Sequence, residues 1–482
     1  MQSKVHHSRR ADRSRRRLNP GGENMRALQV VIAATIIVAA SPARAVPAFA
    51  RKYGTSCTTC HTIFPKLAPF GEAFRRNGFR FPGVDRDYIK QDAITLRRSG
   101  ADETATLPAQ VPLALGFKGQ TTFHPDKDSS GGRADNGAAV NGADAIAEGN
   151  LWGAGSFSEK ATFFAELVVS SHGEVELENA QVHLNDLIGP AHAVNLRIGR
   201  GSSTVSSFGP HSTYLGDGLV VSTPVTALNG ATSDSWNIGG HYNGVEVSGV
   251  LAAGRAAYNI GWNAGSNRDA RDSEDVYGHV GVKFGGMRFD GEGNGRTANG
   301  ERPWEETAIT LDAFAYHSRS SVSFAGATDG DPEILLQDTA NVVGGAIRAQ
   351  WGSLELNSGL YVERHLHAQG DGTSARALAH YDELSYVVAP WIVAAVRFEL
   401  TQLRPDQACG GGGGACPRVT DARIMPGVAF LPYPNLKFVV AALFESASGA
   451  PPGGWESVGG FATGAGPDFE FQNISITGAF AF

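Results

Sequence analysis

Two cysteines and a histidine stand together near the start of the chain, in the sequence Cys57-Thr58-Thr59-Cys60-His61. In a Cys-x-x-Cys-His sequence, the two thiols bond to the vinyl groups of a haem and the histidine binds the iron. The two intervening residues place the sulfurs about one helical turn apart, on the same side of the chain. We therefore predict one covalent haem c, tethered by Cys57 and Cys60, with His61 as an axial ligand of the iron.

Two other chemistries use closely spaced cysteines, namely thiol redox exchange and zinc binding. The remaining cysteines, Cys409 and Cys416, lie far away in the sequence, and no Cys/His set at zinc spacing accompanies the motif. The motif also follows soon after an apolar segment that is typical of export signals. These observations favour haem over the two alternatives.

Apolar and basic residues follow the motif. The apolar ones are Phe64, Leu67, Phe70, Phe74 and Phe79. Leu67, Phe70 and Phe74 have the spacing of one helix face, which predicts an apolar wall for the haem. Three arginines come next, at Arg75, Arg76 and Arg80. We expect them either to neutralise the haem propionates or to lie on the solvated end of a helix.

The stretch from residue 62 to residue 123 contains neither methionine nor histidine. Because c-type haems commonly use a His/Met or His/His ligand pair, a second axial ligand has to come from elsewhere. The options are water, a non-standard side chain, or a residue from the later chain. The last option includes the histidines from His124 onward, Met287 and Met425.

Residues 1–45 are predicted to be a signal peptide with a basic extension. Met25-Arg26 is followed by an uncharged apolar run of about 14 residues, too short to span a bilayer as a helix. The small-x-small triplet Ala43-Arg44-Ala45 then places cleavage after Ala45. The arginines that precede this region indicate an early start codon or an extended positive region rather than nucleic-acid binding.

Export changes the charge of the protein. Removing residues 1–45 takes away nine Lys/Arg and two acidic residues, so the formal net charge changes from −7 to −14. A protein this acidic repels nucleic acid and favours cations or basic protein partners. We therefore expect no nucleic-acid partner.

The chain from residue 109 to residue 482 has an all-β pattern. The sequence contains 61 glycines and only 18% charged residues, which suits turn-rich strands better than helices. Segments of about 8 to 13 residues alternate apolar with polar side chains, and Gly/Asn/Asp/Ser turns separate them. About sixteen such strands, with short turns alternating with long polar loops, predict an outer-membrane antiparallel β-barrel. A soluble sandwich or propeller is the alternative.

The last strand illustrates the pattern. Ile476 and Phe480 point to one face, while Ser475 and Thr477 point to the other. The chain ends on Phe482, and an aromatic residue that closes an amphipathic strand resembles the end of outer-membrane barrels. Such a strand would face lipid on one side and a polar lumen on the other.

Turns and loops are predicted from polar stretches. The candidate outer loops are residues 126–144, 291–303, 326–332 and 402–418. Asn243-Gly244 predicts a two-residue hairpin turn, because both residues tolerate positive φ.

Two further residue pairs offer chemistry in the barrel region. Cys409 and Cys416 flank a glycine run and are a candidate disulfide in an oxidising compartment, with two unrelated free thiols as the alternative. His365 and His367 share one face of a strand, where they would either bind a metal ion or stand together by chance.

The segment around the cysteines resembles a known family. The matching residues are Phe49-Ala50-Arg51, Gly54, Cys57, Cys60, His61, Pro65, Leu67, Phe70-Gly71, Phe74 and Gly78-Phe79. They resemble the N-terminal part of outer-membrane monohaem cytochrome–porin fusions, a family that includes ferrous-iron-oxidising outer-membrane cytochrome c. Only Cys57, Cys60 and His61 carry over with their roles. The resemblance implies one c-type haem in or under a porin-like barrel, passing electrons from an outside donor to a periplasmic cytochrome.

The sequence thus predicts three regions: a signal peptide at 1–45, a small α-helical monohaem cytochrome c segment at 46–95, and a porin-like barrel at 109–482 in the outer membrane of a Gram-negative bacterium. The expected function is outer-membrane electron transfer by an oxidoreductase that oxidises extracellular Fe(II) and reduces a periplasmic c-type cytochrome. The alternatives are outward electron transfer, a porin-like channel plugged by the haem segment, and a soluble periplasmic haem protein. The net charge of −14 also suggests that an acidic barrel mouth concentrates Fe²⁺.

Overall fold

The computed structural model describes residues 48–481, apart from 84, 91–92, 97–104, 109–111, 128–132, 159, 172, 206–210, 216–239, 265–273, 294–301, 325–333, 367–373, 407, 410–413, 416–417 and 450–467. The predicted signal peptide and Phe482 therefore lie outside the described residues. Residues 46–482 form one compact unit. Among the described residues, no helix has the length and apolar character needed to cross a membrane.

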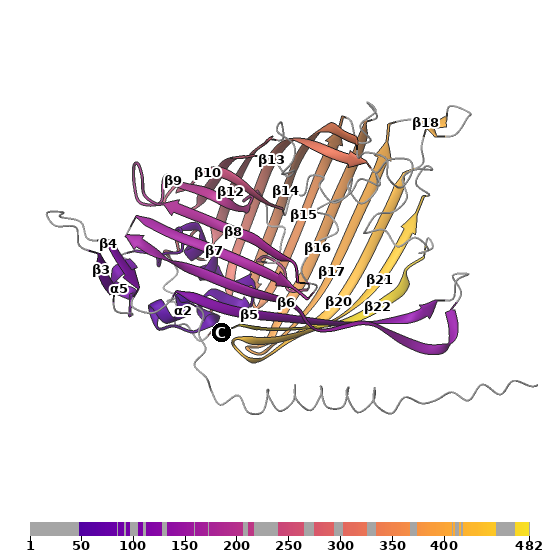
Figure 1. The fold of residues 1–482 in the computed structure, drawn as a ribbon, viewed down its shortest axis with the longest axis horizontal. Coiled ribbons are helices and arrows are strands. Elements are labelled where there is room, and N and C mark those ends of the chain that lie inside the picture. Colours follow the sequence, from indigo (N-terminus) through magenta and orange to yellow (C-terminus); the bar gives the residue numbers. More distant parts are fainter. Residues whose placement is uncertain are drawn as a thin grey trace, which may run out of the picture. The chain divides into compact units, whose positions relative to one another are not determined.

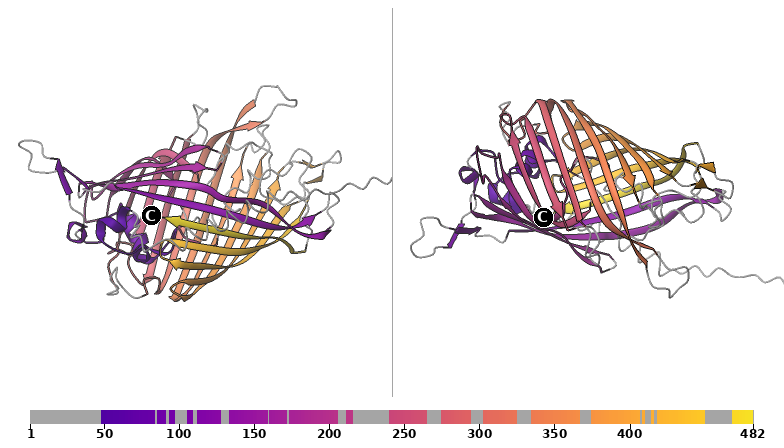
Figure 2. Two further views of the ribbon diagram at one scale, coloured as in Figure 1. Left: turned by 60° about the horizontal axis from the view of Figure 1, so that its bottom comes forward. Right: turned by 90° about the horizontal axis from the view of Figure 1, so that it is seen from above.

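Sixteen strands of the described chain close into an antiparallel barrel (Figures 1 and 2). The first eight are β5 (Leu113–Lys127), β6 (Arg133–Ser158), β7 (Ala161–Ser170), β8 (Val175–Leu184), β9 (Asn195–Ser202), β10 (His241–Leu251), β11 (Ala256–Asn263) and β12 (Glu274–Gly285). The others are β13 (Glu306–Phe324), β14 (Ile334–Gly352), β15 (Leu354–His365), β16 (Ala375–Ala389), β17 (Ile392–Pro405), β20 (Val419–Tyr433), β21 (Leu436–Ser448) and β22 (Glu470–Ala481). The last strand pairs with β5 and completes the ring. The predicted fold class and strand number are confirmed.

The strands form because apolar and polar residues alternate along them. On β12, Val276 and Val280 are 47% and 56% exposed on the outer face, whereas Tyr277, His279 and Lys283 point inward and are buried. The period of two turns the valines of β12 toward lipid and its polar side chains toward the lumen. Closure pairs the backbone of every neighbouring strand, which a lipid environment requires. The protein is therefore an outer-membrane β-barrel.

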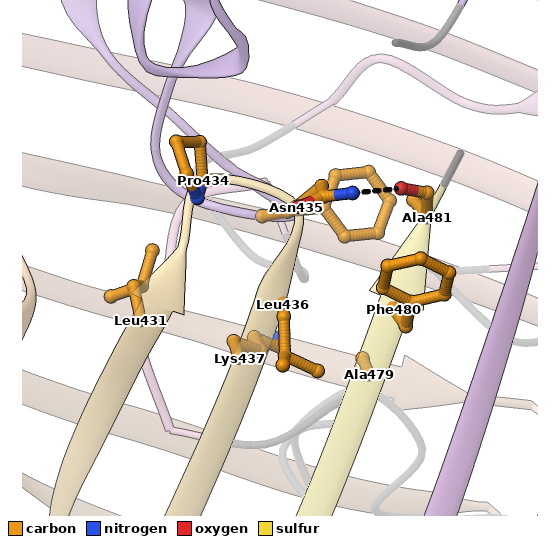
Figure 3. Close-up of a pocket in the computed structure, with 9 residues that line it drawn as sticks. Leu431, Pro434, Asn435, Leu436, Lys437, Ala479, Phe480 and Ala481 are labelled. Carbon is orange, nitrogen blue, oxygen red and sulfur yellow. Dashed lines mark hydrogen bonds between the residues drawn. The ribbon is translucent and has the colours of Figure 1, made fainter. Parts of the chain in front are cut away.

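The two ends of the barrel differ in their connections. Short connections at residues 252–255, 353, 390–391 and 434–435 lie at the end where β5 begins and β22 ends. The strand ends that the longer connections 203–240, 264–273 and 449–469 join lie at the other end. Since outer-membrane barrels carry short turns on the periplasmic side, the C-terminus marks the periplasmic end. There, Ala481 N donates to Asn435 O at 3.0 Å. Asn435 Nδ2 donates in return to Ala481 O at 3.1 Å, the dashed bond in Figure 3.

Three turn and loop predictions need correction. Residues 291–303 belong to the connection between β12 and β13 at the periplasmic end, so they are not an outer loop. Most of residues 126–144 instead extend β5 and β6, whose pairing reaches Lys127 and Arg133. Asn243-Gly244 lies within β10, where both residues pair with β9. A Cβ on Gly244 would lie 2.4 Å from the carbonyl oxygen of Trp262 on the neighbouring strand β11. That glycine permits close strand approach rather than a turn.

The remaining outer-loop predictions fall largely on residues that the structure does not describe. Residues 326–332 lie wholly outside the described residues. Residues 402–418 include the end of β17 and the small pair β18 (Ala408–Cys409) and β19 (Gly414–Ala415), which is consistent with an outer connection.

The chain before the barrel is short and mixed in structure. Its elements are α2 (Ala48–Tyr53), α3 (Cys57–Cys60), β1 (His61–Ile63), β2 (Lys66–Leu67), α4 (Pro69–Arg76), α5 (Asp85–Tyr88), β3 (Ala93–Leu96) and β4 (Ala105–Pro108). Residues 48–83 are called the Cys-His segment below. Figure 1 shows α2 at the same end of the barrel as the C-terminus.

Candidate functional site

The cysteine motif forms one helical turn followed directly by a strand. Ser56 is the N-cap of α3, and its hydroxyl accepts a hydrogen bond from the backbone N–H of Thr58. Cys57 and Cys60 stand at the two ends of this turn, as the spacing predicts, and neither forms a disulfide. His61 then begins β1. The turn thus sets the two cysteines three positions apart, with the histidine directly after the second.

Helix α4 packs directly on this turn. The backbone N–H of Ala68 donates to Cys60 O at 2.9 Å, just before α4 begins. A Cβ at Gly71 would lie 2.0 Å from Cys60 O, so only glycine lets the helix approach this closely. Within the pair Phe70-Gly71, which contributes to the family resemblance, the glycine therefore also has a steric role: it lets α4 pack against Cys60.

His61 has the hydrogen bond expected of a metal-binding imidazole. Its Nδ1 lies 3.2 Å from the carbonyl oxygen of Pro65. A carbonyl oxygen only accepts hydrogen bonds, so Nδ1 carries the proton and the Nε2 lone pair is available to a metal. Burial lowers the pKa of His61 to about 4, which keeps the ring neutral at physiological pH. This observation fits the predicted role of His61 as a haem ligand.

The thiols differ from those of redox-active Cys-x-x-Cys sites. Burial raises the pKa of Cys57 above its usual range and raises that of Cys60 to about 12. Reactive cysteines have a lowered pKa instead, because their thiolate is stabilised. Within the described chain, no three His, Cys, Asp or Glu side chains converge as a metal site requires. A haem does not need such convergence, since its tethers sit at the edge of the ring and its ligand at the centre.

An apolar cluster lines the motif. Its buried members are Tyr53, Phe70, Phe74, Phe81 and Met287, and its partly buried members are Phe49, Cys60, Phe79 and Ile89. Phe70 and Phe74 share one face of α4, as the spacing predicts. Leu67 precedes the helix in β2, and Phe64 packs on the edge of His61 with ring centroids 5.2 Å apart. An apolar surface beside the tether is the setting that a porphyrin requires.

The three arginines have three different environments. Arg80 Nη2 donates to Asp186 Oδ2 at 2.9 Å, and Arg76 lies over the ring of Phe289 at 4.6 Å. Arg75 has no hydrogen-bond or ion-pair partner among the described residues. Burial and neighbouring Arg197 lower the pKa of Arg75 to about 10, so it stays cationic. Arg75 is therefore the arginine that remains available for a propionate.

The Cys-His segment lies inside the barrel. Thr162 on β7 is fully buried, and its hydroxyl donates to Gly78 O at 2.6 Å. Phe79 stacks on Phe164 of the same strand, with ring centroids 5.2 Å apart. Lys52 Nζ donates to Ser156 Oγ on β6 at 2.7 Å. These contacts come from inward faces of the strands, so the segment occupies the lumen toward its periplasmic end.

A buried ionic network fixes the segment to the opposite wall. Lys66 Nζ lies 2.6 Å from Glu355 Oε1 on β15, and Lys66 is fully buried. Arg348 on β14 contacts the same carboxylate at 3.1 Å and also pairs with Glu72 of α4. These four residues, called the Lys66 network, alternate two cations with two anions. The alternation satisfies buried charges that would otherwise be costly.

The connection between β9 and β10 also enters the lumen. Its described parts, residues 203–205 and 211–215, are called the inner loop. Tyr214 N and Leu215 N donate to the carboxylate of Glu383 on β16 at 2.6 and 3.3 Å. The backbone N–H of Leu67 donates to His211 O at 3.0 Å. The inner loop therefore links the Cys-His segment to the barrel wall.

Some inward side chains on the other side of the barrel keep partial exposure in the part of the chain that the structure describes. The inward side chains of Lys118, Glu148 and Ser475, on β5, β6 and β22, remain partly exposed. The small cavity in Figure 3, between Phe64, Lys437 and Phe480, has a volume of about 10 Å³, which holds no more than one water molecule.

Other predicted site residues have mixed outcomes. Met287 packs in the cluster that contains Cys60, and Met425 packs against the cluster of Ile63 and Tyr214. These contacts do not test which residue is the second axial ligand of the iron, which stays a prediction. Cys416, the side chain of Cys409 and all of His367 lie outside what the structure describes, which leaves the disulfide and the histidine pair untested. His365 is buried and pairs with Asp338.

Sequence reasoning missed Lys66 and Glu355, and it did not single out His211 among the histidines from His124 onward. Lys66 differs from an ordinary surface lysine only in its place between the apolar residues Pro65 and Leu67. Apolar and polar residues alternate along β15, and this alternation predicts that Glu355 points into the lumen. It does not predict which residue Glu355 pairs with. His211 follows Pro210 in a polar stretch and carries no local signal.

Comparison with known proteins supports the fold. No protein-family model and no curated protein matches the sequence. Outer-membrane expressed OmpT of Vibrio cholerae matches with a TM-score of 0.50 and 10% identity, over 81% of this chain and 100% of that one. The in-vitro folded OmpT matches with a TM-score of 0.50 and 11% identity, over 80% and 99%, and its trimer form with 0.51 and 10%, over 77% and 99%. At these identities the likeness shows that the chain shares the fold of an outer-membrane barrel.

Proposed function

We propose that this protein transfers electrons at the outer membrane through one covalent haem c held by the Cys-His segment, as in the monohaem cytochrome–porin fusions that it resembles. The donor would be Fe²⁺ outside the cell and the acceptor a periplasmic c-type cytochrome. The observation that carries the proposal is the neutral His61, fixed through Nδ1 by Pro65 O and following two free thiols on one helical turn. When bound, the haem would accept and release single electrons.

The residues of the segment have separate roles in this proposal. Cys57 and Cys60 would tether the group, His61 would bind its iron, and Arg75 would face a propionate. Ser56, beside the tether, is exposed. A periplasmic partner would therefore approach the tether from the end of the barrel that carries the C-terminus. A hydrocarbon core about 30 Å thick separates that partner from the outside, so a luminal haem shortens the path of the electron.

The net charge of −14 after export supports a cationic donor, because an acidic protein concentrates cations near its surface. Asp275, Asp338, Glu363 and Asp421 lie near the outer ends of β12, β14, β15 and β20, but only 0–3% of each residue is exposed, and Asp338 and Asp421 pair with His365 and Arg423. We therefore favour Fe²⁺ as the donor on the overall charge and not on these four carboxylates. Oxidation in whole cells should then slow as ionic strength rises, and a rate independent of salt would contradict this step.

The experiment adds Fe(II) anaerobically to the detergent-purified protein and follows the haem α-band. We expect the haem to be reduced within minutes of mixing. The double variant Cys57→Ser, Cys60→Ser should lose the covalent haem mass and the response, while Cys409→Ser should keep both. Protein of unmodified mass, or a haem that stays ferric with excess Fe(II), would overturn the proposal. Reduced protein that instead passes electrons to an extracellular acceptor would reverse the direction.

A porin-like channel that the Cys-His segment plugs in part is a second candidate. The inward side chains Lys118, Glu148 and Ser475 on β5, β6 and β22 favour it, because they keep partial exposure beside the segment. Conductance in planar bilayers separates the two candidates. Steady ion flow through a protein whose haem does not respond to Fe(II) would favour the channel.

A further inference from the structure

The carbonyl oxygen of Pro65 accepts hydrogen bonds from two imidazole groups. His61 Nδ1 and His211 Nδ1 each lie 3.2 Å from this oxygen. Because a carbonyl oxygen only accepts, both rings carry their proton on Nδ1. The two lone pairs of this oxygen thus accept hydrogen bonds from both the predicted iron ligand, His61, and His211 of the inner loop.

His211 is held in this place from both sides. The backbone N–H of Leu67 donates to His211 O at 3.0 Å, and Lys66 Nζ donates to Ser212 O at 2.7 Å. The next residues of the inner loop donate two backbone N–H groups to Glu383. Burial lowers the pKa of His211 to about 3, so the ring is neutral at physiological pH. The contact with Pro65 is therefore part of a fixed, hydrogen-bonded arrangement.

His211 is in the wrong place to be the second axial ligand. Both Nδ1 atoms lie within 3.2 Å of one oxygen, so they are at most 6.4 Å apart. Two imidazoles on opposite sides of one iron keep their Nδ1 atoms about 8 Å apart, given metal–nitrogen bonds of about 2 Å and a similar span across each ring. If His61 binds the iron, His211 therefore stays beside it rather than opposite it.

We propose that His211 is a positioning residue that tunes the haem by sharing the hydrogen-bond acceptor of His61. This inference rests on the proposed haem. A hydrogen bond from Nδ1 makes a ligating imidazole more basic and stabilises the ferric ion. A second donor draws on the same oxygen and weakens the first bond. His211 therefore raises the reduction potential without touching the iron.

The experiment compares the midpoint potentials of purified, haem-loaded variants by optical redox titration. His211→Leu keeps an apolar volume and removes the donor, while His211→Asn keeps an N–H at a similar distance from the backbone. His380→Ala is the matched control, because His380 Nδ1 also lies 3.0 Å from a backbone carbonyl, that of Gly359, but on β16. The ferric and ferrous absorption spectra are recorded for each variant.

We expect His211→Leu to shift the equilibrium about threefold to tenfold toward the ferric form, where tenfold equals 59 mV for one electron. The spectra should keep the wild-type ligand signature. His211→Asn and His380→Ala should stay within twofold of wild type. An unchanged potential in His211→Leu would contradict the inference, and a changed ligand signature would make His211 an iron ligand. A chain without covalent haem mass would overturn the proposed function, and this inference with it.

Discussion

The Lys66 network should decide how firmly the Cys-His segment stays in the lumen. Its centre is Glu355, whose carboxylate lies 2.6 Å from Lys66 Nζ and 3.1 Å from Arg348. Glu355→Gln removes the carboxylate that both cations contact, while the amide oxygen still accepts a hydrogen bond. Arg348 keeps its pair with Glu72. The loss therefore falls mainly on Lys66, which is fully buried.

The size of the effect follows from the burial of these charges. Removing one partner of a buried ion pair costs about 3–5 kcal/mol. The lower value, about 3 kcal/mol, applies here because Lys66 keeps Ser212 O at 2.7 Å and the ring of Tyr214 at 4.7 Å. That value corresponds to about a hundredfold change in the ratio of docked to undocked segment. Undocking exposes the backbone amides of α4.

Hydrogen–deuterium exchange with mass spectrometry measures this ratio directly. Peptides that cover α4 should exchange about a hundredfold faster in Glu355→Gln than in the wild type, while barrel strands keep their protection. Glu445→Gln is the matched control, because Glu445 is 2% exposed and pairs with Arg423 at 2.7 Å away from the segment. Equal exchange of α4 in the wild type and Glu355→Gln, or an equal rise in Glu445→Gln, would refute the reasoning.

Three further predictions concern the segment and its partners. Gly71→Ala places a Cβ 2.0 Å from Cys60 O, so α4 must shift at a cost of about 1–3 kcal/mol or more, and mass spectrometry should show a smaller haem-bearing fraction. Arg75→Gln removes a luminal cation, which should lower the midpoint potential by roughly 45 mV, or about 1 kcal/mol, and an unchanged redox titration would place the propionates elsewhere. Burial lowers the pKa of His211 from 6.5 to about 3, so the stability that its neutral ring contributes is complete above pH 6.5 and declines as the pH falls toward 3. The amide of Leu67, which donates to His211 O, should therefore lose exchange protection between pH 6 and 4, and constant protection over that range would contradict the shift.

Some errors of sequence reasoning have a common physical cause. Asn243-Gly244 has a strong local preference for a turn, but pairing with β9 and β11 extends both residues within β10. Residues 291–303 are polar like an outer loop, yet their connection carries the buried Met287 and Phe289 against the segment and strands at the periplasmic end. Local composition indicates where strands end. Pairing within the sheet and packing against the Cys-His segment decide whether a residue joins a strand and at which end of the barrel a connection lies.

The sequence by itself determined two features of this protein. The spacing of Cys57, Cys60 and His61 sets both thiols on one turn, because helical geometry acts over four residues. The period-two alternation of apolar residues determined the lipid-facing and luminal sides of strands such as β12 and β15, because side chains alternate along any strand. Both patterns depend on residues close together in the sequence, so they can be recognised before the fold is known.

Only the tertiary structure decided what the segment contacts. Lys66 meets Glu355 across 289 positions of the sequence, and His211 meets Pro65 across 146. Closure of the barrel brings these residues together, since the ring fixes the height and direction of every inward side chain. No local pattern encodes that closure. The segment's place in the lumen, its ionic network and the shared carbonyl therefore follow from the fold and not from any motif.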